Sequence, residues 1–221
     1  QRKWSISFKG LENIPKDKPV LFVMKHRGFA DISLHGMGNL WATSGLSTDL
    51  PSDLLWQDKE ALLDIVSQGE LCRFIMKDEL LNLPLGLHLV LNGGIPVPQD
   101  LETKAKNTEG FDPEDPKVLA RQKEFTSWFN FKDSFREILQ TLKNNGSIMI
   151  YGEATRVHGD KMGHLSLKLI KKLSRGVTVI PVGSVFKDQH MSINYGTPTE
   201  LDDLRCAIAD LSEIHKSQFI D

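Results

Sequence analysis

Two patterns of apolar and polar positions alternate along the chain. Continuous apolar runs, typical of strands buried on both faces of a parallel sheet, lie at residues 18–24, 71–76, 147–152 and 177–185. Apolar residues recur at helical spacing in other segments, which predicts helices near 31–43, 54–69, 118–143 and 200–217. Strands that alternate with helices predict an α/β fold: a single domain over residues 1–221, with a mostly parallel central sheet and helices on both faces.

Shorter segments fill in this scheme. Residues 3–15 alternate and then reach Pro15, which predicts a short strand and a loop, and residues 190–196 alternate as a strand nearer a sheet edge does. Residues 82–97 predict a short helix followed by a short strand. Residues 99–124 lack apolar periodicity and are dense in Asp, Glu, Lys and Pro, so we expect a solvated loop or mobile insertion there.

Composition and charge narrow the function class. The formal net charge of −2 provides no basic excess, so we expect no nucleic-acid partner. The two cysteines, Cys72 and Cys206, lie far apart without a CxxC spacing, which supports neither a disulfide framework nor a structural zinc site. No apolar run approaches the ~18 residues that a membrane-spanning helix needs.

The stretch "VMKHRGFADISL" places a histidine and an aspartate where an apolar strand passes into a helix. Ligand sites of open α/β sheets collect at the carboxyl ends of strands. Gly28 permits a tight turn that brings His26 and Asp31 together. A carboxylate beside an imidazole fixes its tautomer and stabilises the imidazolium, so His26 is a candidate general base. The same pattern also fits a surface histidine before a capped helix.

Further segments resemble one family in the right order. "HRGFAD" matches the HxxxxD motif of the glycerolipid acyltransferase family, which includes lysophosphatidic acid acyltransferases. "FKGLENIPKDKPVLFVMKH" is similar to its lead-in, and "FIMKDELLNLPLGLHLVLNGGIPV" to its second block. "IMIYGEATRV", "VTVIPVGSVF" and "INYGTP" resemble later blocks. The resemblance covers about residues 8 to 200, with inserted loops near 44–65 and 100–125, and implies the fold of that family.

The resemblance also implies an activity and a set of site residues. A fatty acyl group would pass from acyl-CoA or acyl carrier protein to the hydroxyl of a lysophospholipid or related acceptor. His26 would act as the general base and Asp31 would orient it. The substrate-binding residues would be Glu153, Thr155, Arg156, Arg27 and Gly28. The guanidinium of Arg156 suits an anionic head group, since its fork matches phosphate geometry. No metal and no cofactor beyond the co-substrate is implied.

The departures from the family pattern concern the acceptor. Gln99 occupies the position of the usual phosphate-binding arginine, and Lys25, Arg27 or Arg73 are the candidates to compensate for it. Gly152 replaces the usual Pro, and Ala154 replaces the usual Gly. Two alternatives therefore stay open. One is an acyl thioesterase that uses the same dyad on water, and the other is a non-catalytic lipid-binding protein of this fold.

Other residues that could take part in catalysis or binding can also be interpreted as purely structural. Arg156 and Glu153 can pair with each other on one loop. His158 and His164 with Asp160 lack a further ligand at a fitting spacing for a metal site. We expect His35 and His88 to be core or boundary histidines. A basic stripe recurs at helical spacing and suits either solvent or anionic phosphates. It consists of Lys168, Lys171, Lys172 and Arg175.

The expected location follows from the family resemblance. Members work at membranes, so we expect a cytoplasmic protein bound peripherally to the cytosolic face of a membrane. The chain begins with Gln1 rather than Met, which leaves room for an upstream segment with an N-terminal anchor.

Overall fold

The computed structural model describes most of the chain. Its described residues are 5–27, 35–36, 38–39, 42, 72–77, 80, 89–90, 93–128, 131–157, 160–187 and 190–220. The expected inserted loop near 44–65, the helix expected at 54–69 and most of the short helix expected within 82–92 lie outside these residues.

The described residues form a seven-stranded sheet in the order β1-β7-β6-β2-β5-β3-β4. All neighbouring strands are parallel except β6 and β7, which are antiparallel. The strands are β1 (Ser5–Lys9), β2 (Val20–Met24), β3 (Arg73–Lys77), β4 (Gly94–Val97), β5 (Ser147–Tyr151), β6 (Thr178–Lys187) and β7 (His190–Tyr195). The central strand β2 is buried at every residue, as its continuous apolar run predicts.

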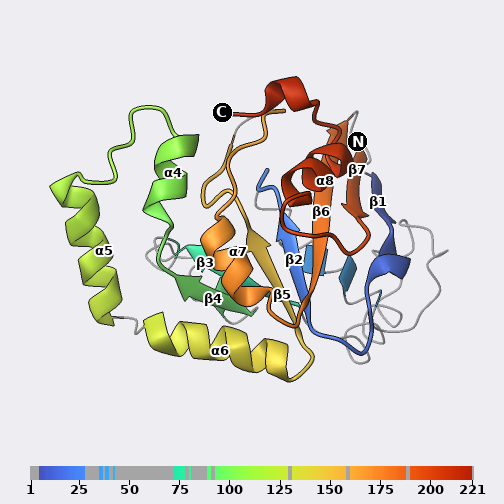
Figure 1. Cartoon of the computed structure of the whole chain (residues 1–221), viewed down its shortest axis with the longest axis horizontal. Coiled ribbons are helices and arrows are strands. Elements are labelled where there is room, and N and C mark those ends of the chain that lie inside the picture. The colour runs from blue at the N-terminus through green and yellow to red at the C-terminus, as the bar shows by residue number, and fades with distance from the viewer. Residues whose placement is uncertain are drawn as a thin grey trace.

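The helices occupy both sides of this sheet. Those labelled in Figure 1 are α4 (Leu101–Asn107), α5 (Pro116–Trp128), α6 (Phe131–Lys143), α7 (Leu167–Leu173) and α8 (Leu204–Leu211). Two short 3-10 turns, η1 (Leu11–Asn13) and η3 (Lys216–Gln218), complete the described elements. On one face of the sheet, α6, α7 and α8 pack against alternate strand residues such as Leu21 and Ile148. Figure 1 shows α7 and α8 in front of the sheet.

The other face carries a second core. Strand residues of the opposite parity, including Phe22, Phe74 and Met149, form it together with the partly buried Ala42. Ala42, His35 and Asn39 are helical, within the helix predicted near 31–43. The prediction of a mostly parallel α/β sheet with helices on both faces is therefore confirmed.

Residues 100–125 are not the loop that their composition suggested, because they contain α4 and most of α5. Capping, rather than apolar periodicity, starts both helices. The Asp100 side chain accepts a hydrogen bond from the backbone N–H of Thr103 at 3.2 Å. The Asp115 side chain accepts one from the backbone N–H of Lys117, and Pro116 occupies the first helical position.

Two other helices differ in length from the prediction. The segment 118–143, expected to be one helix, contains most of α5 and all of α6. Residues 129–130 between these helices lie outside the described residues. The helix expected over 200–217 is shorter, since α8 ends at Leu211 and the left-handed Glu213 turns the chain away. None of the helices within the described residues is long and apolar enough to cross a membrane.

Candidate functional site

The carboxyl ends of four parallel strands meet at one edge of the sheet. His26 follows β2, Glu153 to Arg156 follow β5, and Gln99 and Asp100 follow β4. The strand order β2-β5-β3-β4 places these segments on neighbouring strands. Residues distant in the sequence therefore come together where an open α/β sheet binds its ligands.

A cavity of about 280 Å³ opens at this edge. Its polar lining includes His26, Gln99, Asp100, Thr155, Arg156 and Ser166. Its walls are mainly apolar and come from β3, β4, β5 and α7, with Phe74, Ile75, Met76, Leu80, Val97, Ile150 and Leu169 among them. A largely apolar cavity with a few convergent polar groups is the usual form of a small-molecule site.

His26 lies half-buried at the cavity, directly after the buried Lys25 that follows β2. Its ring packs against that of Tyr151, with the two centroids 4.2 Å apart and the planes inclined by 34°. Tyr151 is the last residue of β5 and lines the same cavity. The predicted partner Asp31 and the turn residue Gly28 lie outside the described residues, so the dyad remains a prediction.

The predicted acceptor residues after β5 separate into two groups. Thr155 and Arg156 line the cavity together with His26. Glu153 does not line it: this side chain is fully buried and accepts hydrogen bonds from the backbone N–H of Gly163 at 2.6 Å and from Lys25. Both carboxylate oxygens of Glu153 thus have partners inside the protein, which gives this residue a structural role, and its substrate-binding role stays a prediction.

Lys25 and Glu153 form an ion pair in the interior. Lys25 Nζ lies 3.5 Å from Glu153 Oε2, and both side chains are 0% exposed. The ammonium also donates to the carbonyl oxygen of Val157 at 3.0 Å. Burial raises the pKa of Glu153, while Lys25 and the backbone N–H groups of Gly163 and His26 oppose that rise. The pair therefore ties the residue before His26 to the loop that carries Arg156.

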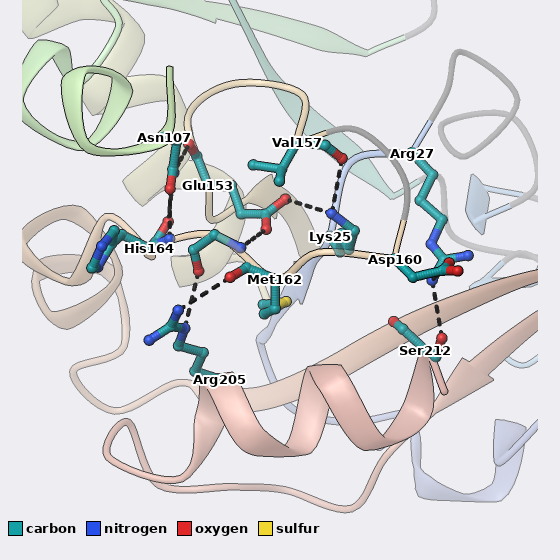
Figure 2. Close-up of polar contacts among 11 residues, drawn as sticks. Lys25, Arg27, Asn107, Glu153, Val157, Asp160, Met162, His164, Arg205 and Ser212 are labelled. Carbon is teal, nitrogen blue, oxygen red and sulfur yellow. Dashed lines mark hydrogen bonds and ion pairs between the residues drawn. The ribbon is translucent and has the colours of Figure 1, made fainter. Parts of the chain in front are cut away.

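None of the three basic residues considered as replacements for the missing arginine lines the cavity. Lys25 is engaged with Glu153, as Figure 2 shows. Arg27 donates to the carbonyl oxygen of Ser212 at 3.0 Å and lies 3.7 Å from an oxygen of Asp160. Arg73 forms an ion pair with Glu137 of α6. The predicted substrate contact of Arg27 is thus not supported, because its guanidinium is held by the loop after α8.

Two further side chains brace the loop after β5 (Figure 2). The amide of Asn107 donates to the carbonyl oxygens of Glu153 and His164, both at 3.0 Å, and accepts from the backbone N–H of His164 at 2.7 Å. Arg205 of α8 donates to the carbonyl oxygens of Gly163 and Met162, each at 3.1 Å. The loop is therefore fixed from α4 and from α8, and its cavity-lining part is held in place.

Gly152 and Ala154, the two departures from the pattern that this sequence resembles, differ in how well they suit the local backbone. The backbone N–H of Gly152 donates to the carbonyl oxygen of Met24 at 3.3 Å, a bond that proline lacks. A Cβ at Gly152 would meet Leu165 and Val23 at 3.0 and 3.1 Å. Ala154 adopts φ = 55°, the left-handed region that favours glycine. A glycine at position 154 would therefore adopt this backbone with less strain than alanine does.

Asp100 and Ser166 add a polar wall that the sequence patterns did not identify. The Ser166 hydroxyl donates to Asp100 Oδ2, which also accepts from the Thr103 hydroxyl at 2.8 Å. Partial burial raises the pKa of Asp100, but the hydrogen bonds from Ser166 and Thr103 and the charge of Lys168 outweigh it and lower the pKa overall. Asp100 is therefore an ionised carboxylate at the cavity, and the Asp100–Thr103 spacing of a capped helix was its available sequence signal.

The remaining candidates lie away from the cavity. His158 is outside the described residues, and Asp160 faces Arg27, so no group of three metal-ligating side chains forms within the described part of the chain. His35 is a core histidine, as predicted, and burial lowers its pKa from 6.5 to about 3. In the basic stripe, Lys168 pairs with Glu102 at 2.6 Å, and Lys172 lies 4.2 Å from the ring centre of Phe135.

Comparisons with known proteins support the fold. No protein-family model matches the chain, and no curated protein sequence matches it. The structure is similar to the crystal structure of the 1-acyl-sn-glycerophosphate (LPA) acyltransferase PlsC from Thermotoga maritima. The match has a TM-score of 0.50 and 17% sequence identity, and it covers 95% of this chain and 70% of that chain. The chain thus has the α/β fold of that acyltransferase.

Proposed function

We propose that this protein is an O-acyltransferase of the glycerolipid type. It transfers a fatty acyl group from an acyl thioester, acyl-CoA or acyl carrier protein, to the hydroxyl of a lysolipid or related acceptor. One observation carries the proposal: His26, Thr155 and Arg156 line the same cavity, whose other walls are mainly apolar. The apolar walls suit an acyl chain, and the polar group suits the reacting ester and head group. The likeness to an LPA acyltransferase supports the same conclusion.

In the proposed reaction His26 accepts the proton of the acceptor hydroxyl. The resulting nucleophilic oxygen attacks the thioester carbonyl carbon and forms a tetrahedral intermediate. The intermediate collapses as the carbon–sulfur bond breaks, and the imidazolium returns the proton to the departing thiolate. Asp31 orients the imidazole and stabilises its charged form. Arg156 binds an anionic group of one substrate through its planar fork. No covalent acyl-enzyme and no metal enter these steps.

The test is a product assay on purified protein with one acyl-CoA and a panel of lysolipid acceptors, analysed by mass spectrometry. His26→Ala should lower the rate of acyl transfer by about 10²–10⁴, which is the usual contribution of a general base. His164→Ala is the matched control, since the known contacts of His164 are made by its backbone. Transfer by His26→Ala at the wild-type rate would contradict the mechanism.

The same assay distinguishes the alternative functions. A thioesterase would release free fatty acid at a rate independent of added acceptor. A non-catalytic lipid-binding protein would consume no acyl donor above background. The acyltransferase proposal requires that donor consumption rise with acceptor concentration and that the acylated acceptor account for it.

Peripheral binding to a membrane is part of this proposal. Lysolipid acceptors reside in bilayers, and the α7 residues Lys171 and Lys172 with the following Arg175 offer cationic side chains to anionic lipid. Flotation with liposomes that contain anionic phospholipid should carry the protein upward, and high salt should reduce the bound fraction. Protein that stays wholly at the bottom of the gradient would contradict membrane binding.

A further inference from the structure

The side-chain amide of Gln99 is buried at the cavity without a hydrogen-bond partner. Both Nε2 and Oε1 are inaccessible to solvent, and neither has a partner among the described residues. Gln99 follows β4 and lines the cavity that His26 and Arg156 also line. Buried amide groups are almost always hydrogen-bonded, because an unmet donor or acceptor is costly. Both atoms of the Gln99 amide would be hydrogen-bonded if a ligand in the cavity supplied one donor and one acceptor.

The neighbouring Asp100 narrows the chemistry of that ligand. Its carboxylate accepts bonds from Thr103 and Ser166 and lines the same cavity. Oδ1 receives one of these bonds, from the Thr103 backbone N–H, so it retains capacity for another donor. An ionised carboxylate only accepts hydrogen bonds and repels an anion at close range. The Asp100 end of the cavity therefore favours a hydrogen-bond donor over an anion, although the positive charge of Lys168 offsets part of the repulsion.

Phosphate and hydroxyl groups differ in how well they can hydrogen-bond to Gln99 and Asp100 together. A phosphate offers acceptors only, so it can use the NH₂ of Gln99 but leaves Oε1 unmatched and faces the charge of Asp100. A pair of adjacent hydroxyl groups donates to Oε1 and to the carboxylate while it accepts from the NH₂ of Gln99. Complementary hydrogen bonds to a buried polar group give strong discrimination, because the wrong ligand leaves that group unpaired.

We propose that Gln99 and Asp100 form a subsite for an uncharged, hydroxyl-bearing head group, so that the acyl acceptor is a neutral polyol lipid rather than a phosphate monoester. This proposal rests on the proposed acyltransferase function, because it identifies the acceptor that binds in the same cavity. The two adjacent hydroxyls of the polyol bind at Gln99 and Asp100, and in the reaction one of them passes its proton to His26 and attacks as the nucleophile. Arg156, on the loop after β5, then binds the phosphates of the donor.

Binding without an acyl donor tests the subsite separately from catalysis. Calorimetric titration in mixed detergent micelles compares three probes that share one monounsaturated hydrocarbon tail: monooleoylglycerol, oleoyl lysophosphatidic acid and oleyl alcohol. Monooleoylglycerol should bind roughly tenfold more tightly than either of the others, because only it offers neighbouring uncharged hydroxyl groups. Equal or tighter binding of the phosphate lipid would overturn the proposal.

Two substitutions check that these residues cause the preference. Gln99→Arg should reverse the order in favour of the phosphate lipid, since a guanidinium pairs with phosphate. Asp100→Asn should weaken the discrimination against phosphate while it preserves the helix start, because Asn caps helices as well as Asp. Gln140→Arg adds the same charge on α6, away from the cavity, and should leave the order unchanged. An unchanged order in both Gln99→Arg and Asp100→Asn, with circular dichroism as in wild type, would also overturn the proposal.

Acyl-transfer assays with the same lipids separate the two proposals. Preferred binding of monooleoylglycerol with no transfer to any acceptor sustains the subsite and contradicts the acyltransferase. Transfer to lysophosphatidic acid, together with tighter binding of that lipid, sustains the acyltransferase and contradicts the subsite.

Discussion

Lys25 and Glu153 lie 128 positions apart in the sequence and form an ion pair of 3.5 Å in the interior. Lys25 immediately precedes the candidate base, and Glu153 begins the loop that carries Arg156. Because the Glu153 carboxylate also binds the backbone N–H of Gly163, the pair connects three segments around the cavity. The relative position of His26 and Arg156 therefore depends on a contact that neither of them makes.

Breaking this pair should cost stability. Glu153→Gln removes the negative charge and leaves the buried Lys25 ammonium without its Glu153 counter-charge, which should lower the free energy of unfolding by about 3–5 kcal/mol. Lys25→Met combined with Glu153→Gln removes both charges and should cost much less than the sum of the single changes. Urea unfolding of the single and double variants measures the coupling. Glu102→Gln, which breaks the exposed pair with Lys168, should leave the midpoint nearly unchanged and serves as the control.

A substitution at Ala154 should raise the free energy of unfolding rather than lower it. Its φ of 55° is unfavourable for a residue with a Cβ, and glycine removes that cost at the expense of greater freedom in the unfolded chain. Ala154→Gly should therefore stabilise the protein by about 0.5–1 kcal/mol. Ala105→Gly, in the interior of α4, is the matched control and should destabilise it by a similar amount, about 0.5–1 kcal/mol. A loss of stability in Ala154→Gly would contradict the argument.

The sequence predicted the sheet well, because a strand that is buried on both faces has an unbroken run of apolar residues, such as residues 20–24. It failed at residues 100–117, where α4 and the first turn of α5 begin at the caps Asp100 and Asp115 and bury little; the rest of α5 lies within the helix predicted over 118–143. Apolar periodicity does not detect helices of this kind, whereas an Asp directly before Pro116 is a start signal.

The candidate site likewise has features that the sequence predicted and features that it did not. His26 could be singled out from the sequence because it closely follows the apolar run of β2; it lines a cavity at that strand end, and its role as general base stays a prediction. The burial of Lys25 and Glu153 could not be foreseen, because each appears polar in its own segment and only the sheet brings them together. The resemblance located Glu153 correctly in the loop after β5, but local sequence does not tell which residues of that loop turn inward.

Acid should destabilise the protein through His35. Its side chain is 1% exposed and packs edge to face on Phe22, and its pKa falls from 6.5 to about 3 because burial opposes the charged form. Below pH ~6.5 the unfolded chain binds a proton that the native state does not, so the free energy of unfolding falls as the pH drops toward about 3. By pH ~5 the loss should reach about 2 kcal/mol. Urea unfolding of His35→Gln should show a shallower loss over this range, and an equally steep one would exclude His35 as the cause.

Arg156 should affect transfer through charge and geometry together. Arg156 lines the cavity with His26, and in the proposed function its guanidinium presents a planar fork to an anionic group. Arg156→Ala should lower kcat/KM for acyl transfer by about a hundredfold, the usual effect of removing one preorganised donor. Arg156→Lys should recover part of this loss, because an ammonium restores the charge but not the fork. Steady-state kinetics with Arg73→Ala as control, whose guanidinium pairs with Glu137 outside the cavity, separate this effect from a general loss of positive charge. If the anionic group belongs to the donor, the loss appears mainly in the KM for acyl-CoA, and wild-type kinetics in Arg156→Ala would remove this residue from the site.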